Sequence, residues 1–269
     1  MGRGLPQPPA PIAETARYHI LRWMIRKNRV IPIDSAKLLV FDLDGTLVDS
    51  QIDLANAVNA MLRNYHRPVL PVSLIATYIG DGANMLVRRA LGDPADETFV
   101  SEAYDIFIKH YREHLLDNTR AYAGAVDALR AIRERTNGSV AMAVLTNKPV
   151  NPSRRIVDGL GMKELFVHVY GGNSFETKKP DPLGALTLLR ETSTAPAEAV
   201  MIGDSQNDIL TARNSGMWAL GVTYGFSPDS LKSPAPDVLI DSPQELPEAL
   251  GYSSSRKSLE VPPGQGFAG

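Results

Sequence analysis

Short apolar runs that recur along the chain constrain its fold more than any other feature. The first covers residues 38–41 and precedes Asp42; others cover residues 140–145, 167–170, 200–202, 219–222 and 238–240. Such runs are typical of strands buried on both faces of a parallel sheet. Helical patterns separate them at about residues 124–136, 152–160, 181–191 and 205–215. The alternation predicts an α/β fold with a Rossmann-like, doubly wound parallel sheet.

Residues 50–118 interrupt this alternation because they contain no convincing strand. They carry helical patterns near residues 50–65, 72–78, 83–91 and 95–117, and Ser50 and Asp53 have the spacing of a capping box for the first helix. The insert leaves the sheet directly after the first strand, at the edge where ligands bind in such sheets. We therefore expect a small α-helical cap at 50–118 that acts as a lid over a core formed by 36–49 and 119–250.

The two ends of the chain differ from this core in composition. Residues 1–11 are rich in Pro and Gly, and residues 251–269 in Ser, Pro and Gly, so we expect both to be disordered. Residues 13–29 show a basic, helical, amphipathic pattern that suits a membrane surface or a targeting segment. We favour the simpler alternative, in which residues 1–35 form an extension that is disordered or a loosely docked helix.

Composition and charge exclude several classes of function. A net charge of −2 argues against a dedicated nucleic-acid-binding protein, and the absence of cysteine excludes disulfides, thiolate metal sites and cysteine catalysis. No apolar run approaches the roughly 20 residues that a membrane helix needs, and no secretory signal pattern is present. We expect a cytoplasmic protein without an integral membrane span, either a monomer or a homodimer.

Two carboxylates, Asp42 and Asp44, follow the first predicted strand with one residue between them. A carboxylate can attack the phosphorus of a phosphate ester and so divide one slow hydrolysis into two easier steps. A second carboxyl group can protonate the leaving alkoxide and then deprotonate the attacking water. Asp42 suits the first role and Asp44 the second, although a solvated Asp-Gly turn is the ordinary alternative.

Polar residues also follow the later strands. Thr146 and Asn147 can donate hydrogen bonds to a phosphoryl oxygen, and a lysine of the pair at 178–179 can neutralise its charge. Asp204 and Asp208 stand one helical turn apart after another strand. Each pattern alone is also explained by helix capping or by solvated charges. Parallel strands, however, bring their carboxyl ends to one edge, so we expect these residues to form one site.

Magnesium prefers oxygen ligands and only a few protein carboxylates. Asp42, the backbone carbonyl of Asp44, and Asp204 supply such a set. We therefore expect Mg²⁺ as the cofactor and a small phosphorylated metabolite as the ligand.

The motifs and their order resemble the haloacid dehalogenase-like (HAD) hydrolase superfamily across residues 37–250. The resemblance implies a nucleophile at Asp42, a general acid/base at Asp44, and a motif lysine at Lys179 rather than Lys178. It further implies phosphate binding by Thr146, Asn147 and Lys179, and metal binding by Asp42, Asp44, Asp204 and Asp208.

Four shorter stretches, at residues 48–50, 78–83, 145–149 and 222–225, are similar to the phosphoglycolate phosphatases within that superfamily. The similarity implies hydrolysis of 2-phosphoglycolate to glycolate and phosphate. An arginine of the cap would then pair with the glycolate carboxylate, and a solvated helix face is an equal alternative. Asn173 departs from the subgroup, which often has Asp there. The cap residues that we expect to select the substrate are Gly80, Asp81, Gly82, Arg88 and Arg89.

Two other functions share these motifs. A phosphomutase of the β-phosphoglucomutase type would carry sugar-binding polar residues in its cap. A non-enzymatic binding protein on the same fold is disfavoured, because no catalytic position is substituted. The leading expectation is a phosphatase.

Overall fold

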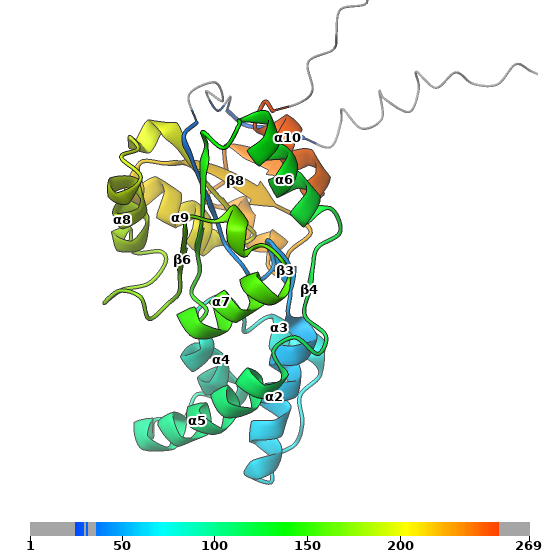
Figure 1. Ribbon diagram of the computed structural model, residues 1–269. Helices are drawn as coiled ribbons and strands as arrows, with labels where there is room; N and C mark the ends of the chain where they lie inside the picture. The colour runs from blue at the N-terminus through cyan, green and yellow to red at the C-terminus, as the bar shows by residue number, and fades with distance from the viewer. Residues whose placement is uncertain (1–24, 30, 32–35, 253–269) are drawn as a thin grey trace, which may run out of the picture.

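The computed structural model describes residues 25–29, 31 and 36–252. Its central element is a seven-stranded sheet (Figure 1). Every neighbouring pair of strands is parallel except β1 with β9. The strands in spatial order are β1 (Arg26–Lys27), β9 (Val238–Ile240), β8 (Trp218–Val222), β7 (Ala199–Gly203), β2 (Leu38–Phe41), β5 (Ala141–Leu145) and β6 (His168–Tyr170). The expected doubly wound α/β sheet is confirmed.

Strand β2 lies at the centre of the sheet, where the order of the strands reverses. The chain runs from β2 through β5 to β6 on one side, then returns to β7, β8 and β9 on the other. Phe41 at the end of β2 pairs in register with Val144 of β5 and Ile202 of β7. The loops after these three strands therefore meet at one topological switch point, where ligands bind in folds of this kind.

Helices cover both faces of the sheet because alternate strand residues point to opposite sides. Leu39 and Phe41 join the apolar cluster that includes residues of α6 (Ala125–Arg135), α7 (Val150–Gly159) and α10 (Leu246–Ala249). Leu38 and Val40 join the cluster that includes α8 (Leu183–Glu191) and α9 (Gln206–Ser215). Short 3₁₀ helices complete the core at Lys163–Leu165, Pro196–Glu198, Pro228–Lys232 and Pro243–Glu245.

Four further helices form a separate bundle below the sheet in Figure 1, and we call them the cap helices. They are α2 (Gln51–Asn64), α3 (Val72–Ala76), α4 (Ala83–Ala90) and α5 (Glu97–His114). Two short segments connect the cap helices to the core. They form the strands β3 (Val48–Asp49) and β4 (Arg120–Ala121), which pair antiparallel with each other. The sequence does not reveal these strands because each has only two residues.

The basic segment near the N-terminus is not helical where the structure describes it. Arg26–Lys27 forms β1 and pairs with β9, and the Arg26 side chain lies 2.6 Å from Asp241. The backbone N–H groups of Asn28 and Arg29 donate to the Asp237 carbonyl. The helix expected over 13–29 is therefore wrong at its end, because the open edge of β9 supplies hydrogen-bond partners to an extended chain. Residues 1–24 and 253–269, including both ends expected to be disordered, lie outside the described residues.

The capping box expected at the start of α2 is also wrong. Ser50 makes no side-chain cap; its Oγ donates instead to Asp44 Oδ1 at 2.5 Å. The Asp53 carboxylate is buried and accepts hydrogen bonds from the backbone and side chains of Asn118 and Thr119, at 2.7–3.0 Å. Long-range donors outcompete the local cap, and Asp53 thereby ties the start of α2 to the chain that returns to the core.

No helix within the described part of the chain combines the length and the apolar character needed to cross a membrane.

Candidate active site

Asp42 lies at the carboxyl end of β2 and is 8% exposed. Its backbone N–H continues the ladder by donating to the Ile202 carbonyl of β7. Lys179 Nζ lies 2.9 Å from Asp42 Oδ1 and 2.5 Å from Asp208 Oδ1, and all three side chains are buried. Asp42, Lys179 and Asp208, which the sequence predicts in one site, therefore lie in contact. One ammonium group holds two carboxylates in place.

Burial and crowding raise the pKa values of two carboxyl groups in this cluster. Burial raises the pKa of Asp42 to about 6; Lys179 opposes the shift and Asp208 adds to it. Burial, followed by the charges of Asp208 and Asp42, raises the pKa of Asp204 well above its usual value. For Lys179, burial disfavours the charged form, but Asp208 and Asp42 outweigh it, so its pKa is raised. The site thus carries more negative charge than its lysine compensates.

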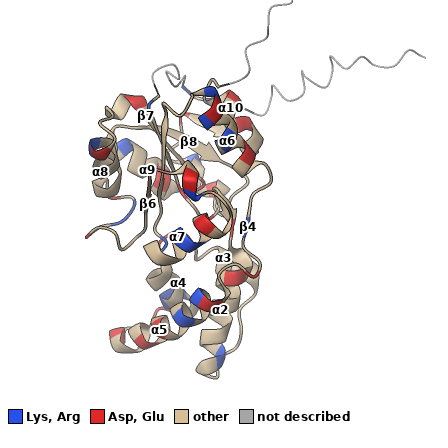
Figure 2. Ribbon diagram, viewed as in Figure 1, with Lys and Arg blue, Asp and Glu red and all other residues tan. Residues whose placement is uncertain are grey.

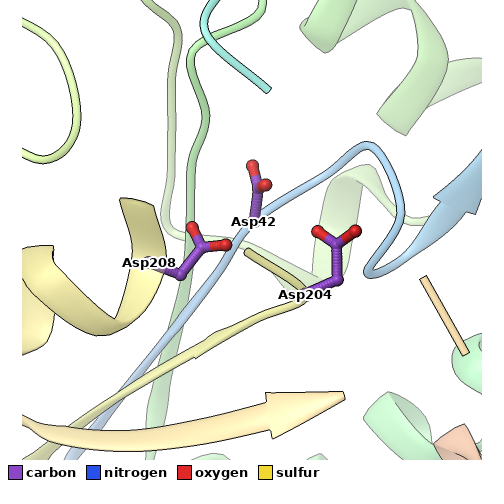
Figure 3. Close-up of side chains that lie close together, drawn as sticks. All are labelled: Asp42, Asp204 and Asp208. Atoms are coloured by element: carbon purple, nitrogen blue, oxygen red, sulfur yellow. The ribbon is translucent and has the colours of Figure 1, made fainter. Parts of the chain in front are cut away.

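Asp42, Asp204 and Asp208 have carboxylate oxygens within 4.8 Å of one another (Figure 3). The chain approaches Asp204 so closely that a Cβ on Gly45, whose φ is +81°, would lie 2.3 Å from Asp204 Oδ2. These three buried carboxylates, two after strand ends and one in the first turn of α9, are oxygen donors of the kind that a hard divalent cation prefers. These residues therefore fit a metal ion of the Mg²⁺ type.

Asp208, like Asp204, has protein partners at both of its carboxylate oxygens. Its Oδ2 accepts hydrogen bonds from the Ser205 backbone and hydroxyl, forming a capping box for α9, and its Oδ1 faces Lys179. Its evident role is to position Lys179. The family resemblance implies an indirect or water-mediated contact of Asp208 with the metal, and this role stays a prediction.

The Asp44 carboxylate faces away from this cluster. Ser50 Oγ donates to its Oδ1, and Lys148 Nζ lies 3.1 and 3.0 Å from its two oxygens. Burial disfavours the Lys148 ammonium, but Asp44 and then Tyr111 outweigh that effect and raise the pKa of Lys148. Neither Ser50 nor Lys148 was assigned a role in the site from the sequence. Lys148 directly follows Thr146 and Asn147 in the sequence, and this position could have indicated that its side chain belongs to the site.

Thr146 and Asn147 follow β5, as expected, and both line the cavity. The Asn147 amide, however, donates to the Gly80 carbonyl at 2.9 Å and to the Lys179 carbonyl at 3.0 Å. Both of its donor hydrogens are therefore used, and its side chain joins the cap loop to the lysine loop instead of reaching toward a phosphate. The Thr146 hydroxyl oxygen accepts a hydrogen bond from the Lys148 backbone N–H at 3.3 Å.

The cap loop at 80–82 is held by side chains of the core. The Asp81 carboxylate accepts a 2.8 Å hydrogen bond from Asn207, and the Lys178 ammonium donates to the Asp81 carbonyl. Gly80 and Gly82 line the cavity, whereas Asp81 does not. Burial raises the pKa of Asp81, but Asn207 and Arg89 outweigh it and lower the pKa. These contacts fasten the cap to the core.

Arg88 and Arg89 do not lie where substrate selection requires them. Arg88 donates to the Pro94 carbonyl and pairs with Glu97, and Arg89 donates to the Tyr78 carbonyl and pairs with Asp81. Neither arginine is among the residues that line the cavity. Figure 2 shows both basic and acidic residues on α5, and the two arginines of α4 are neutralised by acidic residues within the cap.

A single cavity joins the two halves of the site. The core contributes its polar wall, with Asp42, Asp44, Lys148 and Asp204 among its residues. The cap contributes an almost entirely apolar wall. Its residues are Leu54, Ile79, Gly80, Gly82, Ala83, Leu86, Phe107, Ile108 and Tyr111.

Residues 39–222 match the family model described as haloacid dehalogenase-like hydrolase. The chain belongs to this family. It is a phosphoric monoester hydrolase, as relatives that match most of its length are named for phosphatase activity.

Two of these relatives are named phosphoglycolate phosphatase. The protein from Psychrobacter arcticus is 39% identical over 199 residues, which cover 71% of this chain and 85% of the relative. The protein from Photobacterium profundum is 36% identical over 220 residues, which cover 79% of this chain and 95% of the relative. Among solved structures, a predicted phosphoglycolate phosphatase from Haemophilus somnus 129pt has a TM-score of 0.74 and 32% identity, and the match covers 80% of this chain and 97% of that one.

Proposed function

We propose that the protein is a Mg²⁺-dependent phosphatase that hydrolyses a small phosphorylated metabolite, with 2-phosphoglycolate as the first choice, through an aspartyl-phosphate on Asp42. The observation that carries the proposal is the placement of Asp42 and Asp44 on one cavity, with Lys179 bound to the first and Lys148 to the second. The names of the most similar relatives support the choice of substrate.

In the first step, an Asp42 oxygen attacks phosphorus while the bond from phosphorus to the ester oxygen breaks. Asp44 gives its proton to the departing alkoxide, which leaves as the alcohol. In the second step, Asp44 takes a proton from a water molecule, whose oxygen attacks phosphorus and breaks the bond to Asp42. Lys179 holds the Asp42 carboxylate and offsets negative charge near the transferred group.

A bound Mg²⁺, held by Asp42, Asp204 and the Asp44 carbonyl, would offset the charge of the phosphoryl oxygens. Asp208 holds Lys179 in this scheme. Thr146 and Asn147 follow β5 at the end of the sheet that carries Asp42 and Asp44. We therefore keep both as proposed phosphate-binding positions, with the Thr146 hydroxyl as the hydrogen-bond donor.

The cap residues 50–118 serve in this proposal as a lid that excludes water from the cavity. Its apolar wall disfavours a phosphomutase of the β-phosphoglucomutase type, because a sugar needs polar partners. A non-enzymatic binding protein is disfavoured by the intact catalytic positions. We further propose a cytoplasmic location, which agrees with the absence of cysteine.

A panel of phosphate esters tests the proposal. With Mg²⁺, purified protein is expected to release phosphate from 2-phosphoglycolate with a higher kcat/KM than from glucose 1-phosphate or glycerol phosphate, and a chelator should abolish the activity until Mg²⁺ is restored. Asp42→Asn should lower kcat by about 10⁴-fold or more, because it removes the nucleophile.

Asp229→Asn is a matched control, because the side chain of Asp229 is 91% exposed and lies on the 3₁₀ helix Pro228–Lys232. Its activity should equal that of the parent. The proposal fails if the protein is inert toward every ester, or if Asp42→Asn is as active as the parent.

A further inference from the structure

The Lys148 ammonium lies at the boundary between the core and the cap. Its Nζ faces both Asp44 oxygens and lies 4.6 Å from the centre of the Tyr111 ring, and its side chain is 3% exposed. An ammonium group has three N–H donors. Asp44 accepts at most two of them, and the third is directed toward the neutral Tyr111 side chain, for which an anionic ligand in the cavity can substitute.

Tyr111 reaches the same place from the cap helix α5. It is 1% exposed and lines the cavity, and its hydroxyl interacts with the Lys148 ammonium. Its oxygen can accept from that ammonium, but its O–H has no acceptor among the described residues and can donate to a ligand at the cavity wall. Burial raises the pKa of Tyr111 to about 12, so the hydroxyl remains protonated and can donate.

The rest of the cavity offers no second basic side chain, among the described residues, for an anionic leaving group. Lys148 is the one basic side chain among the described residues that line it. Arg88 and Arg89, which would be the obvious carboxylate partners, are bound within the cap. The remaining cap wall is formed by side chains such as Leu86 and Phe107, beside which an unpaired charge is strongly disfavoured.

We propose that Lys148 and Tyr111 bind a carboxylate of the leaving alcohol, which makes the enzyme selective for phosphate esters of short α-hydroxy acids. This inference rests on the proposed phosphatase function. Asp44 must reach the ester oxygen to protonate it, and Lys148 lies 3.0 Å from the Asp44 carboxylate. A carboxylate one carbon beyond the ester oxygen is therefore within reach of Lys148. A longer acid would extend toward the apolar wall instead.

The test compares three esters: 2-phosphoglycolate, ethyl phosphate, which lacks the carboxylate, and the phosphate ester of 3-hydroxypropanoate, which is one carbon longer. The parent should prefer 2-phosphoglycolate over ethyl phosphate by about 100-fold or more in kcat/KM, because a buried anion site rejects a ligand that leaves it unpaired. The parent should prefer 2-phosphoglycolate over the ester of the longer acid by about 10-fold in kcat/KM.

Lys148→Met should lower this preference over ethyl phosphate by about 30-fold or more, mainly through KM for 2-phosphoglycolate. Any loss of support for Asp44 affects both esters and cancels in the ratio. Tyr111→Phe, which keeps the ring and its packing, should lower the ratio by about 5-fold. The Tyr111→Phe variant tests the carboxylate site even if Lys148→Met does not fold.

Lys178→Met is the matched control. Lys178 also joins the core to the cap loop, but it is exposed and lies outside the lining of this cavity. Its ratio should equal that of the parent.

Two outcomes overturn the inference while leaving the phosphatase proposal intact. In the first, the parent hydrolyses both esters without preferring the carboxylate. In the second, the parent prefers it, but the ratio stays within threefold in both Lys148→Met and Tyr111→Phe, so that these residues serve Asp44 and the packing alone. A parent inert toward all three esters overturns the proposed function itself.

Discussion

The two walls of the cavity are built on opposite principles. The core wall concentrates charge: Asp42, Asp44 and Lys148 line it, and Lys179 lies behind it between Asp42 and Asp208. The cap wall presents hydrocarbon and keeps its arginines in ion pairs elsewhere. In the proposed function, this difference assigns the reaction to the core, and the exclusion of water and the shape of the leaving group to the cap.

After loss of the nucleophile itself, the largest expected effect comes from removing the lysine charge behind the core wall. Lys179→Met should lower kcat by about 10³-fold, because it removes a buried charge beside the nucleophile. It should also lower the free energy of unfolding by about 3–5 kcal/mol, since it leaves the buried Asp42 and Asp208 carboxylates without their partner. Steady-state kinetics and denaturant unfolding measure the two effects.

The exposed neighbour Lys178 serves as the control, and Lys178→Met should keep at least a tenth of the parental kcat. A Lys179→Met variant with nearly parental kcat would remove the reason for assigning the chemistry to this cluster.

A smaller effect is expected where the cap is joined to the core. Burial raises the pKa of Asp53, but the hydrogen bonds from Asn118 and Thr119 outweigh it and lower the pKa. Because the folded pKa lies below the unfolded value of about 3.9, the stabilisation is present above about pH 4 and is lost as the pH falls through the folded pKa. Asp53→Asn should therefore lower the free energy of unfolding by about 1–3 kcal/mol at pH 7.

Denaturant unfolding at pH 7 and near pH 3.5 measures this change, and the difference from the parent should shrink at the lower pH. Asp127→Asn is the control, because Asp127 is an exposed acid in the first turn of α6. An Asp53→Asn variant that matches the parent at pH 7 would show that these hydrogen bonds contribute little.

The smallest effect is expected from the arginines of the cap. Arg88→Ala and Arg89→Ala should each change the preference for 2-phosphoglycolate over ethyl phosphate by less than about threefold, because both side chains are engaged in partly exposed ion pairs outside the cavity lining. The same kcat/KM ratio measures it. A large drop in this ratio for either arginine variant would show that the arginines of the cap select the substrate, and would contradict the contrast between the two walls.

Much of the fold and of the reacting cluster follows from the sequence alone. Apolar runs such as 38–41 reveal buried strands directly, and parallel strands bring the residues that follow them to one edge. Asp42, Lys179 and Asp204 were therefore placed together correctly, although they are far apart in the chain.

The remainder depended on partners that no local pattern specifies. Ser50 looks like a helix cap but donates to Asp44, and Arg89 looks like a ligand for a substrate but pairs with Asp81. The pairing of Lys148 with Asp44 joins residues on different strand ends, and the strand at 26–27 exists only because β9 has an open edge. Each of these contacts depends on tertiary packing, which overrides local propensity.

The pairing of β3 with β4 joins the two chain connections of the cap into one ribbon, and that ribbon adjoins Asp44. Val48 of β3 bridges to Asp44, and the Gly45 N–H donates to the Val48 carbonyl. The covalent link between cap and core is therefore hydrogen-bonded to the Asp-rich turn itself. In the proposed reaction, a displacement of the cap would be transmitted through this ribbon to the proton donor.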